Sequence, residues 1–176
     1  MISPAFQVET ERLKLFPLSP EELRLYLENP AELEQQLHIP LSHEVVTERV
    51  RRAIQMKLNK LAIVGKADYP WYTYWLLVVV AVPFGAGLIG FKGSPNEEGE
   101  AEIGYGIDPA FQGQGYTTEA VRALIAWAFQ TPDCRAVVAR NTLKKNTASN
   151  RILQKVGMFV YKETSDALWW RIESRK

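Results

Sequence analysis

Residues 102–119 lead from a short apolar strand through a loop with two glycines into an amphipathic helix. Because Gly113 and Gly115 carry no side chain, the backbone N–H groups of residues 113–117 are able to approach a ligand closely. The unsatisfied N–H groups of the first helical turn point in the same direction. Such a loop binds anions, and the sequence therefore predicts a pyrophosphate site here.

The loop needs a strand that ends before it and a helix that begins after it. Pro109 removes a donor from the ladder, so the strand over residues 101–107 must stop there. Glu119 places a negative charge in the first helical turn, where the helix dipole favours it. The helix is expected to end before Pro132. Its apolar residues repeat at helical spacing and are Val121, Leu124, Ile125 and Ala128.

A second helix carries related end signals. Asn146 is a good N-cap, and Gly157 supplies the left-handed position that follows a last turn. One apolar face runs between them, through Ala148, Ile152 and Val156. We therefore expect a short amphipathic helix between the two end signals.

Together these segments resemble the GNAT superfamily of acetyl-CoA-dependent N-acetyltransferases, most closely its RimJ/RimL-type branch. The family's pyrophosphate motif, Arg/Gln-x-x-Gly-x-Gly/Ala, is similar to Gln112-Gly-Gln-Gly115-Tyr-Thr117. Its Asn-x-x-Ser…Lys-x-Gly-Phe motif falls on Asn146, Ser149, Lys155 and Gly157, with Met158 before Phe159. The opening run Glu9-Thr-Glu-Arg-Leu-Lys-Leu also resembles the first strand of that branch.

The resemblance implies an α/β (α+β) GNAT fold, a mixed and mostly antiparallel sheet of about seven strands with helices on both faces. The length suits one domain over residues 1–176. The implied activity is transfer of the acetyl group of acetyl-CoA to a primary amine, a protein N-terminus or a small amine, in a ternary complex. The coenzyme contacts that it implies are Ile107, Gln112, Gly113, Gln114, Gly115, Tyr116, Thr117 and Asn146.

Two side chains receive catalytic roles from the resemblance. A glutamate on the strand before the loop accepts the amine proton in this family, which assigns the role to Glu102; a solvated or lysine-paired glutamate is the alternative. Ser149 is assigned to hydrogen-bond the leaving thiolate, and an ordinary first-turn serine is the alternative.

The resemblance also implies that a backbone N–H polarises the thioester carbonyl. A bulge that separates the strand over 101–107 from its neighbour would free a donor between residues 104 and 107, and Gly104 and Gly106 suit such a bulge. Tyr105 faces the opposite side of the pleat from Glu102, so we expect it to pack in the core.

Two residues depart from the family pattern. Thr117 stands where a smaller residue usually ends the pyrophosphate motif, which requires that this position need neither a positive φ nor a bare Cα. Leu153 stands where many of these enzymes carry a tyrosine that protonates the thiolate. Both departures keep open a second hypothesis, a catalytically silent acyl-CoA-binding sensor.

Composition excludes several other classes. The chain has 21 Lys and Arg against 20 Asp and Glu, which lacks the positive charge that nucleic acid binding requires. His38 and His43 form no metal-binding motif, and the single Cys134 suits a reducing compartment. The start, residues 1–7, lacks the pattern of a signal peptide, and the apolar run 75–82 is too short to cross a bilayer. We expect a cytoplasmic enzyme without membrane or metal partners; the sequence leaves a homodimer open.

The remaining elements follow from periodicity. We expect a helix opening at Ser19 and Pro20, and a helix over 43–61. The charged residues expected to be solvated on that longer helix are Arg51, Arg52, Lys57 and Lys60. The predicted strands cover residues 6–16, 71–82, 84–92, 135–140, 158–163 and 167–173.

Three further patterns have a structural interpretation. The run Gly85-Ala-Gly-Leu-Ile-Gly90 fits a dinucleotide fingerprint, but no helix can begin after it, so we interpret it as a strand that other backbone approaches closely. The aromatic residues at 71–75 and at Trp169 and Trp170 are expected to be mainly core, with one face of each cluster free to line an acceptor channel.

Overall fold

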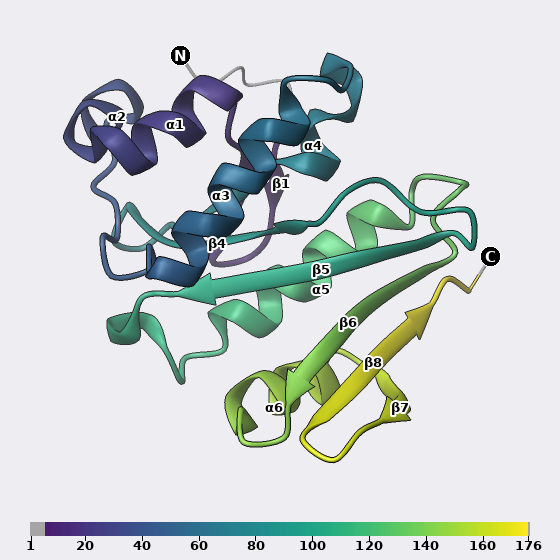
Figure 1. Cartoon of the computed structure of the whole chain (residues 1–176). Helices are drawn as coiled ribbons and strands as arrows, with labels where there is room; N and C mark the ends of the chain where they lie inside the picture. The colour runs from purple at the N-terminus through teal and green to yellow at the C-terminus, as the bar shows by residue number, and fades with distance from the viewer. Residues whose placement is uncertain (1–5, 176) are drawn as a thin grey trace.

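The computed structural model describes residues 6–175. Most of the segment that was considered for a signal peptide, residues 1–7, therefore lies outside the described residues. These residues form a sheet of eight strands, against about seven predicted, in the order β1-β2-β3-β4-β5-β6-β8-β7 (Figure 1). β5 and β6 are parallel, and the other neighbouring pairs are antiparallel. The strands are β1 Val8–Glu9, β2 Leu13–Pro17, β3 Trp75–Val79, β4 Phe84–Phe91, β5 Glu100–Ile107, β6 Ala136–Leu143, β7 Phe159–Glu163 and β8 Ala167–Glu173.

Helices cover both faces of this sheet, as predicted. The α-helices are α1 Pro20–Glu28, α2 Pro30–Leu37, α3 Glu48–Leu61, α4 Tyr69–Tyr72, α5 Tyr116–Ala128 and α6 Thr147–Lys155, and short 3₁₀ turns lie at Lys66–Asp68 and Pro109–Phe111. Ser19 caps α1 in a capping box, as its sequence indicates. α2 was not predicted, although Asn29 and Pro30 carry the same pair of start signals.

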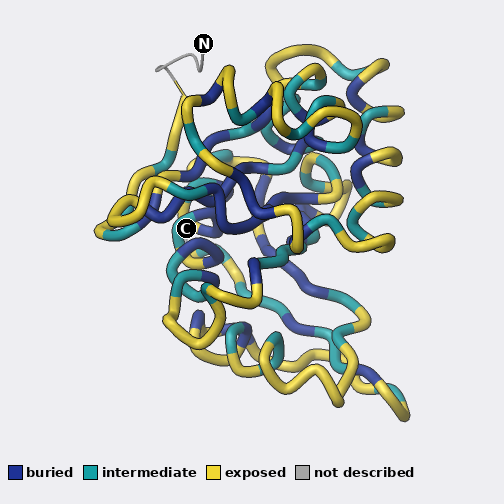
Figure 2. Tube along the Cα trace, turned by 90° about the vertical axis from the view of Figure 1, so that its left-hand side faces the viewer, coloured by how far each residue is buried: buried dark blue, intermediate teal, exposed yellow. Residues whose placement is uncertain are grey.

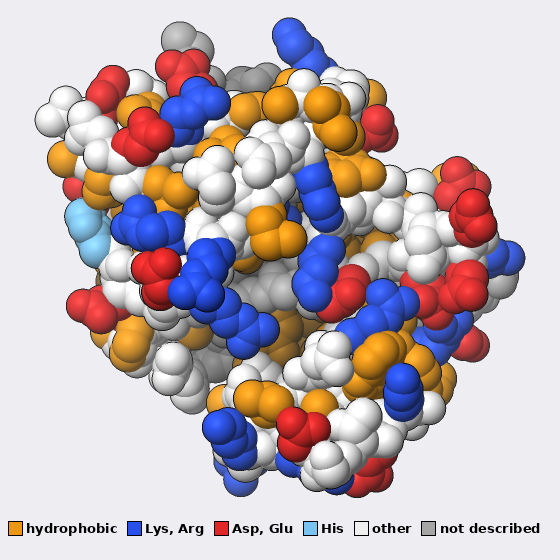
Figure 3. Space-filling view, viewed as in Figure 1, with side chains coloured by type: hydrophobic (Ala, Val, Ile, Leu, Met, Phe, Trp, Pro, Cys, Tyr) orange, Lys and Arg blue, Asp and Glu red, His pale blue; other side chains and the backbone are white. Residues whose placement is uncertain are grey.

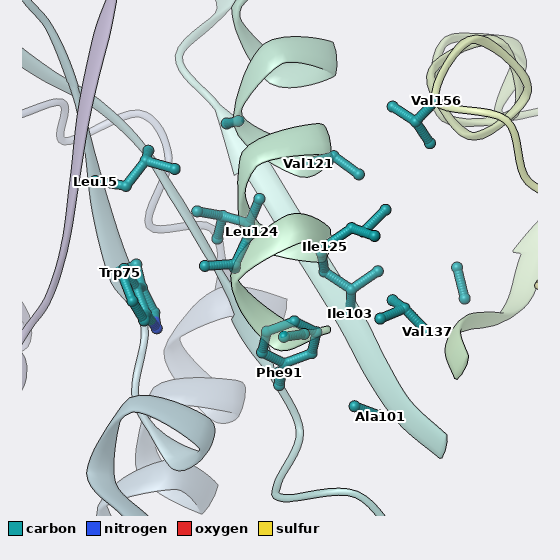
Figure 4. Close-up of a cluster of buried hydrophobic side chains, with 14 of the residues drawn as sticks. Leu15, Trp75, Phe91, Ala101, Ile103, Val121, Leu124, Ile125, Val137 and Val156 are labelled. Atoms are coloured by element: carbon teal, nitrogen blue, oxygen red, sulfur yellow. The ribbon is translucent and has the colours of Figure 1, made fainter. Parts of the chain in front are cut away.

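Two apolar layers hold the helices to the sheet. α1, α2 and α3 pack on one face, through residues such as Leu23, Leu33 and Ile54. α5 and α6 pack on the other, where Ile125 lies beside the sheet residue Ile103 (Figure 4). Figure 2 shows the buried residues concentrated in the strands at the centre of the molecule. The sheet therefore lies between two apolar cores.

β5 and β6 separate along their length (Figure 1). Their pairing covers three residue pairs and ends at Glu102 and Val138. The bulge responsible lies on β6, where the register with β8 shifts between Ala139 and Thr142 and Asn141 has a φ of 54°. The predicted separation is confirmed, but the bulge is not at the glycines of β5, whose register with β4 is regular.

Several predicted elements have different limits. The single strand expected over 6–16 is divided into β1 and β2, and β3 and β6 end at Val79 and Leu143 instead of residues 82 and 140. α3 begins at Glu48, capped by Thr47, so the expected helical residues 43–47 precede it. Residues 71–74 are not strand, because Tyr69–Tyr72 form α4 before β3 begins at Trp75. The rings of Trp71 and Trp75 lie 4.6 and 5.0 Å from that of Trp127, so this part of the aromatic cluster is core.

The glycines of β4 allow close backbone approach, as the sequence indicates. A Cβ on Gly87 would lie 2.6 Å from the carbonyl oxygen of Gly106 on β5. No helix follows this strand, since residues 92–99 form turns and bends. The dinucleotide fingerprint is therefore a packing feature.

Lys57 was predicted to be solvated, and this was wrong. Its side chain is buried and donates to the carbonyl oxygens of Phe91 at 2.5 Å and Tyr72 at 3.4 Å. Its ammonium lies 4.6 Å from the centre of the Tyr74 ring. Lys57 therefore ties α3 to the end of β4, at the cost of a buried charge.

This burial predicts a pH dependence of stability. Desolvation, together with the nearby Lys60 and Lys92, lowers the pKa of Lys57 from 10.5 to about 7. Between these values the unfolded chain binds more protons than the native one, so the free energy of unfolding rises with pH and falls as pH drops toward 7. We expect Lys57→Met to flatten this rise in urea titrations at pH 7 and 9. Lys66→Met, at an exposed position and not among the groups that lower the pKa of Lys57, is the control, and an equal slope in all three proteins would contradict the prediction.

Candidate functional site

The glycine loop after β5 has the geometry of an anion cradle. Gly113 and Gly115 have φ values of +73° and +83°, which side chains rarely adopt. Gly115 is the N-cap of α5, so the loop leads directly into the unpaired N–H groups of the first turn. A Cβ on Gly113 would meet no atom within 4 Å, and residues 112–115 are exposed. The loop therefore has room for a phosphate group beside its backbone donors.

Thr117 is compatible with this loop. It is the second residue of α5, is buried, and is not among the described residues with positive φ. The bare Cα that the family pattern favours is thus not required at this position. Tyr116 opens the helix, and Gln114 donates its side-chain amide to the carbonyl of Ala110 at 3.2 Å.

Arg12 fixes the loop from the start of the chain, a role that sequence reasoning missed. Its guanidinium donates to the carbonyl of Gln114 at 2.9 Å and to the carboxylate of Glu119 at 2.7 Å. Thr10 donates to the same carboxylate at 2.6 Å. Burial opposes the charged form, but these donors hold the pKa of Glu119 below its ordinary value. Glu119 therefore binds residues 10–12 to α5, in addition to placing a negative charge in the first turn of that helix.

Asp108 fixes the other end of the loop. This buried carboxylate accepts from the backbone N–H of Ala110 at 2.8 Å and from the hydroxyl of Ser42 at 2.6 Å. Ser42 belongs to the segment before α3 and also accepts from Val45. The loop is thus joined to the layer of α1–α3 across the sheet.

Glu102 lies where β5 and β6 begin to separate, on the α3 side of the sheet. Its carboxylate pairs with Lys92 and, at 3.3 Å, with Arg140. Glu100, two residues earlier on the same face of β5, pairs with Arg140 and Arg171. The lysine-paired alternative for Glu102 is therefore present in the structure, and its carboxylate is held toward the gap between the strands.

The backbone N–H groups along β5 point alternately toward β4 and toward β6, which narrows the choice of donor to the thioester oxygen. The carbonyl of Glu102 and the N–H of Asp108 both bond to β4, at 2.9 and 2.7 Å. Successive residues of a strand point their backbone groups to opposite sides. The N–H groups of Tyr105 and Ile107 therefore point toward β6, beyond the last paired residues of the two strands. These two are the candidate donors to a thioester oxygen within residues 104–107.

The start of α6 faces the same gap. Asn146 caps the helix by accepting from the N–H of Ser149 at 3.1 Å, which confirms its predicted capping role. The hydroxyl of Tyr105 donates to the carbonyl of Ser149 at 3.5 Å. Burial raises the pKa of Tyr105 to about 12, and a hydrogen bond with Ser149 offsets a part of that rise. Tyr105 packs against the core as predicted, but its hydroxyl reaches the edge of the gap.

The predicted site residues therefore gather around one strand separation. The loop lies at the end of β5, Glu102 on its α3 side, and Ser149 on the side of α6. Leu153 is 1% exposed and packs in the core, so this side chain supplies no acid to the site. Within residues 6–175, no three His, Cys, Asp or Glu side chains are grouped as a metal site. No helix of this part of the chain is long and apolar enough to cross a membrane.

This combination defines the acetyltransferases of the GNAT type. Residues 12–159 match the family model described as Acetyltransferase (GNAT) domain, and the chain belongs to this family. It is 31% identical over 81 residues, 46% of the chain, to the uncharacterized N-acetyltransferase YjdG of Bacillus subtilis (strain 168). It is 30% identical over 108 residues, 61% of the chain, to the uncharacterized N-acetyltransferase p20 of Bacillus licheniformis. The matches span 48% and 57% of these two relatives.

Solved structures share the fold. A ribosomal L7/L12 alpha-N-protein acetyltransferase, RimL, has a TM-score of 0.67 at 20% identity, with 96% of this chain and 94% of that chain covered. A ribosomal-protein-S5-alanine acetyltransferase from Vibrio fischeri has a TM-score of 0.65 at 17% identity, with 97% of each chain covered. A chimera of spermidine N-acetyltransferase SpeG from Vibrio cholerae and hSSAT has a TM-score of 0.63 at 14% identity, with 93% and 96% covered. The predicted likeness to the RimJ/RimL-type branch is confirmed at the level of the fold.

Proposed function

We propose that this chain transfers the acetyl group of acetyl-CoA to a primary amine by direct attack in a ternary complex. The observation that carries the proposal is the open cradle formed by Gly113 and Gly115 at the N-terminus of α5, next to the separation of β5 and β6. The pyrophosphate lies on the cradle, bonded to N–H groups of residues 113–117. Gln112, Gln114, Tyr116 and Asn146 line the path of the coenzyme. The pantetheine arm enters the gap between the strands.

The carbonyl and the amine meet beside Glu102. The N–H of Tyr105 or Ile107 donates to the thioester oxygen as negative charge develops there. The amine nitrogen forms a bond to the carbonyl carbon while the carbon–sulfur bond breaks. The proton lost by the amine goes to the carboxylate of Glu102, directly or through a water. No covalent enzyme intermediate is needed, because the amine is itself the nucleophile.

The sulfur leaves as a thiolate next to the first turn of α6. Ser149 donates its hydroxyl to this thiolate, and the positive end of the helix dipole favours the same anion. The thiolate then takes its proton from solvent.

Ser149→Ala is expected to slow transfer by about ten- to a hundredfold, since a hydrogen bond to a charged group contributes about 1.5–3 kcal/mol. Steady-state kinetics at saturating acetyl-CoA measure this. A variant with full turnover and a lower melting temperature would make Ser149 a residue of the helix start only.

Binding of CoA tests the coenzyme part of the proposal. A ligand that binds only the native chain stabilises it by about 2.7 kcal/mol at a hundredfold excess over its Kd. We expect CoA and acetyl-CoA to raise the melting temperature by several degrees. The absence of a shift with either ligand at millimolar concentration would overturn the proposal.

A second candidate is an acyl-CoA sensor without turnover, favoured by the buried Leu153 in place of the usual acid. Both candidates predict the melting shift. Release of free CoA in the presence of an amine library, followed with a thiol reagent, separates them. Binding without CoA release from any amine would favour the sensor.

A further inference from the structure

The α3 side of the sheet is uncovered beyond β5. Among the described residues, α1–α3 lie over β2, β3 and β4, whereas α6 packs on the other face of β6 and β8 (Figure 1). The face that carries Glu102 therefore continues across β6, β8 and β7 without a helix above it. It offers an extended acceptor an uncovered surface that leads away from the gap.

Positive charge gathers on this face. Figure 3 shows Lys and Arg side chains around a hollow in the middle of this side of the molecule. Lys60 and Lys92 lie on one side of Glu102, with the Lys60 ammonium donating to the carbonyl of Lys92 at 2.9 Å. On the other side the cations are Arg140, Lys162 and Arg171.

The carboxylates on this face are fewer than the cations. Glu100 and Glu102 pair with Lys92, Arg140 and Arg171, and Glu173 also pairs with Arg171 at 3.0 Å. Lys60 and Lys162 are in excess. Glu163 on β7 does not change this balance, since it pairs with Lys144 at 2.6 Å. The face therefore carries a net positive charge beside the proposed proton acceptor.

An aromatic surface lies within this charge. The Trp169 ring has the ammonium of Lys162 4.1 Å and the guanidinium of Arg140 5.9 Å from its centre. Tyr161 stands against it at 6.1 Å, edge to face. Trp169 is only partly buried, unlike its neighbour Trp170 in the core. We call these four residues the Trp169 platform.

The sheet geometry sets the distance from Glu102 to this platform. Glu102, Val138 and Arg171 lie in one row across β5, β6 and β8. Two strand spacings amount to about 10 Å from Glu102 to Arg171, and Trp169 lies two residues, about 7 Å, along β8 from Arg171. An extended peptide advances about 3.3 Å per residue. An acceptor whose N-terminal amine lies at Glu102 thus brings the side chains of its second to fourth residues within reach of the Trp169 platform.

Resting on the proposed acetyl transfer, we infer that the acceptor is the N-terminus of a protein or peptide with acidic residues directly after the first. Its carboxylates pair with Lys162, which has no carboxylate partner among the described residues, and its extended backbone lies on the Trp169 platform. A polyamine would carry several positive charges into a face that is already positive.

Three peptides of equal length and identical first residue test the inference, with acidic, amide or basic side chains at the next three positions. Acetylation is followed by CoA release and mass spectrometry, beside spermidine as a fourth acceptor. We expect kcat/KM to be highest for the acidic peptide, by about tenfold or more over the basic one. The preference should shrink when salt is raised, because exposed charges are screened.

A charge-reversal variant tests whether Lys162 is the source of the preference for the acidic peptide. Lys162→Glu should reduce kcat/KM for the acidic peptide by about tenfold and raise it for the basic peptide. Lys66→Glu, an exposed change in the turn before α4, is the matched control and should alter neither. Quenching of tryptophan fluorescence by the acidic peptide provides a binding readout that does not need turnover.

The outcomes distinguish failure of the acidic acceptor from failure of the proposed acetyl transfer. Equal or better acetylation of the basic peptide or of spermidine would overturn the acidic acceptor and leave acetyl transfer intact. An unchanged preference in Lys162→Glu would overturn the platform as its source. Binding of CoA without acetylation of any of the four acceptors, and no quenching by the acidic peptide, would overturn both.

Discussion

Glu102→Gln is expected to lower kcat by about 10²- to 10⁴-fold while the Kd for CoA stays the same. Loss of a general base typically has an effect of this size. Glutamine keeps the shape of the side chain and an acceptor oxygen for Lys92 and Arg140, but it takes up no proton. The deficit should be largest at low pH, where less of the amine is neutral. Initial rates between pH 6 and 9, with CoA affinity by calorimetry, measure both quantities.

Glu100→Gln is the matched control for this variant. Glu100 lies on the same strand and the same face and shares Arg140 as a partner, but its carboxylate is 8% exposed and held between Arg140 and Arg171. We expect it to lower the melting temperature and to leave kcat within a few-fold. Equal loss of kcat in both variants would show that the ion pairs, and not proton transfer, sustain turnover.

Gly115→Val is expected to raise the Kd for CoA by at least about a hundredfold. A branched side chain at a φ of +83° forces the backbone to rotate, so that N–H groups leave the phosphate. Each lost hydrogen bond to a charged group contributes about 1.5–3 kcal/mol. Calorimetric titration with CoA measures the loss.

Two other glycines serve as comparisons. Gly113→Ala also introduces a side chain at positive φ, but into open space, so it tests the loop if Gly115→Val does not fold. Gly65→Ala adds a methyl group before α4, where only a carboxylate oxygen of Asp68 lies within 4 Å, and it should leave CoA affinity unchanged. Equal losses of affinity at Gly65 and Gly113 would place the phosphate elsewhere. Gly87 is unsuitable as a control, because its Cβ would meet the Gly106 carbonyl.

The sequence predicted those elements whose ends carry local signals. Ser19, Asn146 and Gly157 lie where capping rules place them, and β5 ends before Pro109. α3 begins later than predicted, because the apolar spacing continues through Val46 although the cap is at Thr47. α4 was missed because its aromatic residues also fit a strand, and only the packing of Trp71 on Trp127 decides between the two.

The site could be predicted only where it is contiguous in the chain. The loop and the first turn of α6 are short motifs, so their positions followed from the sequence. The partners of Glu102 and the links from Arg12 and Ser42 come from distant segments, and nothing in the local pattern joins them. Lys57 illustrates the same limit, since a charged residue among charged neighbours gives no sign that it is buried.

The hydrogen bonds of Arg12 and Thr10 have a consequence for how the site forms. Thr10 is 109 residues from Glu119, so closing this contact confines a long stretch of chain. β3, β4 and β5 pair with near neighbours and are able to assemble before it. The cradle therefore has its described shape only while residues 10–12 are docked on α5. Coenzyme binding depends on this long-range contact, and a chain that lacks its first twelve residues should form much of the sheet and bind CoA poorly.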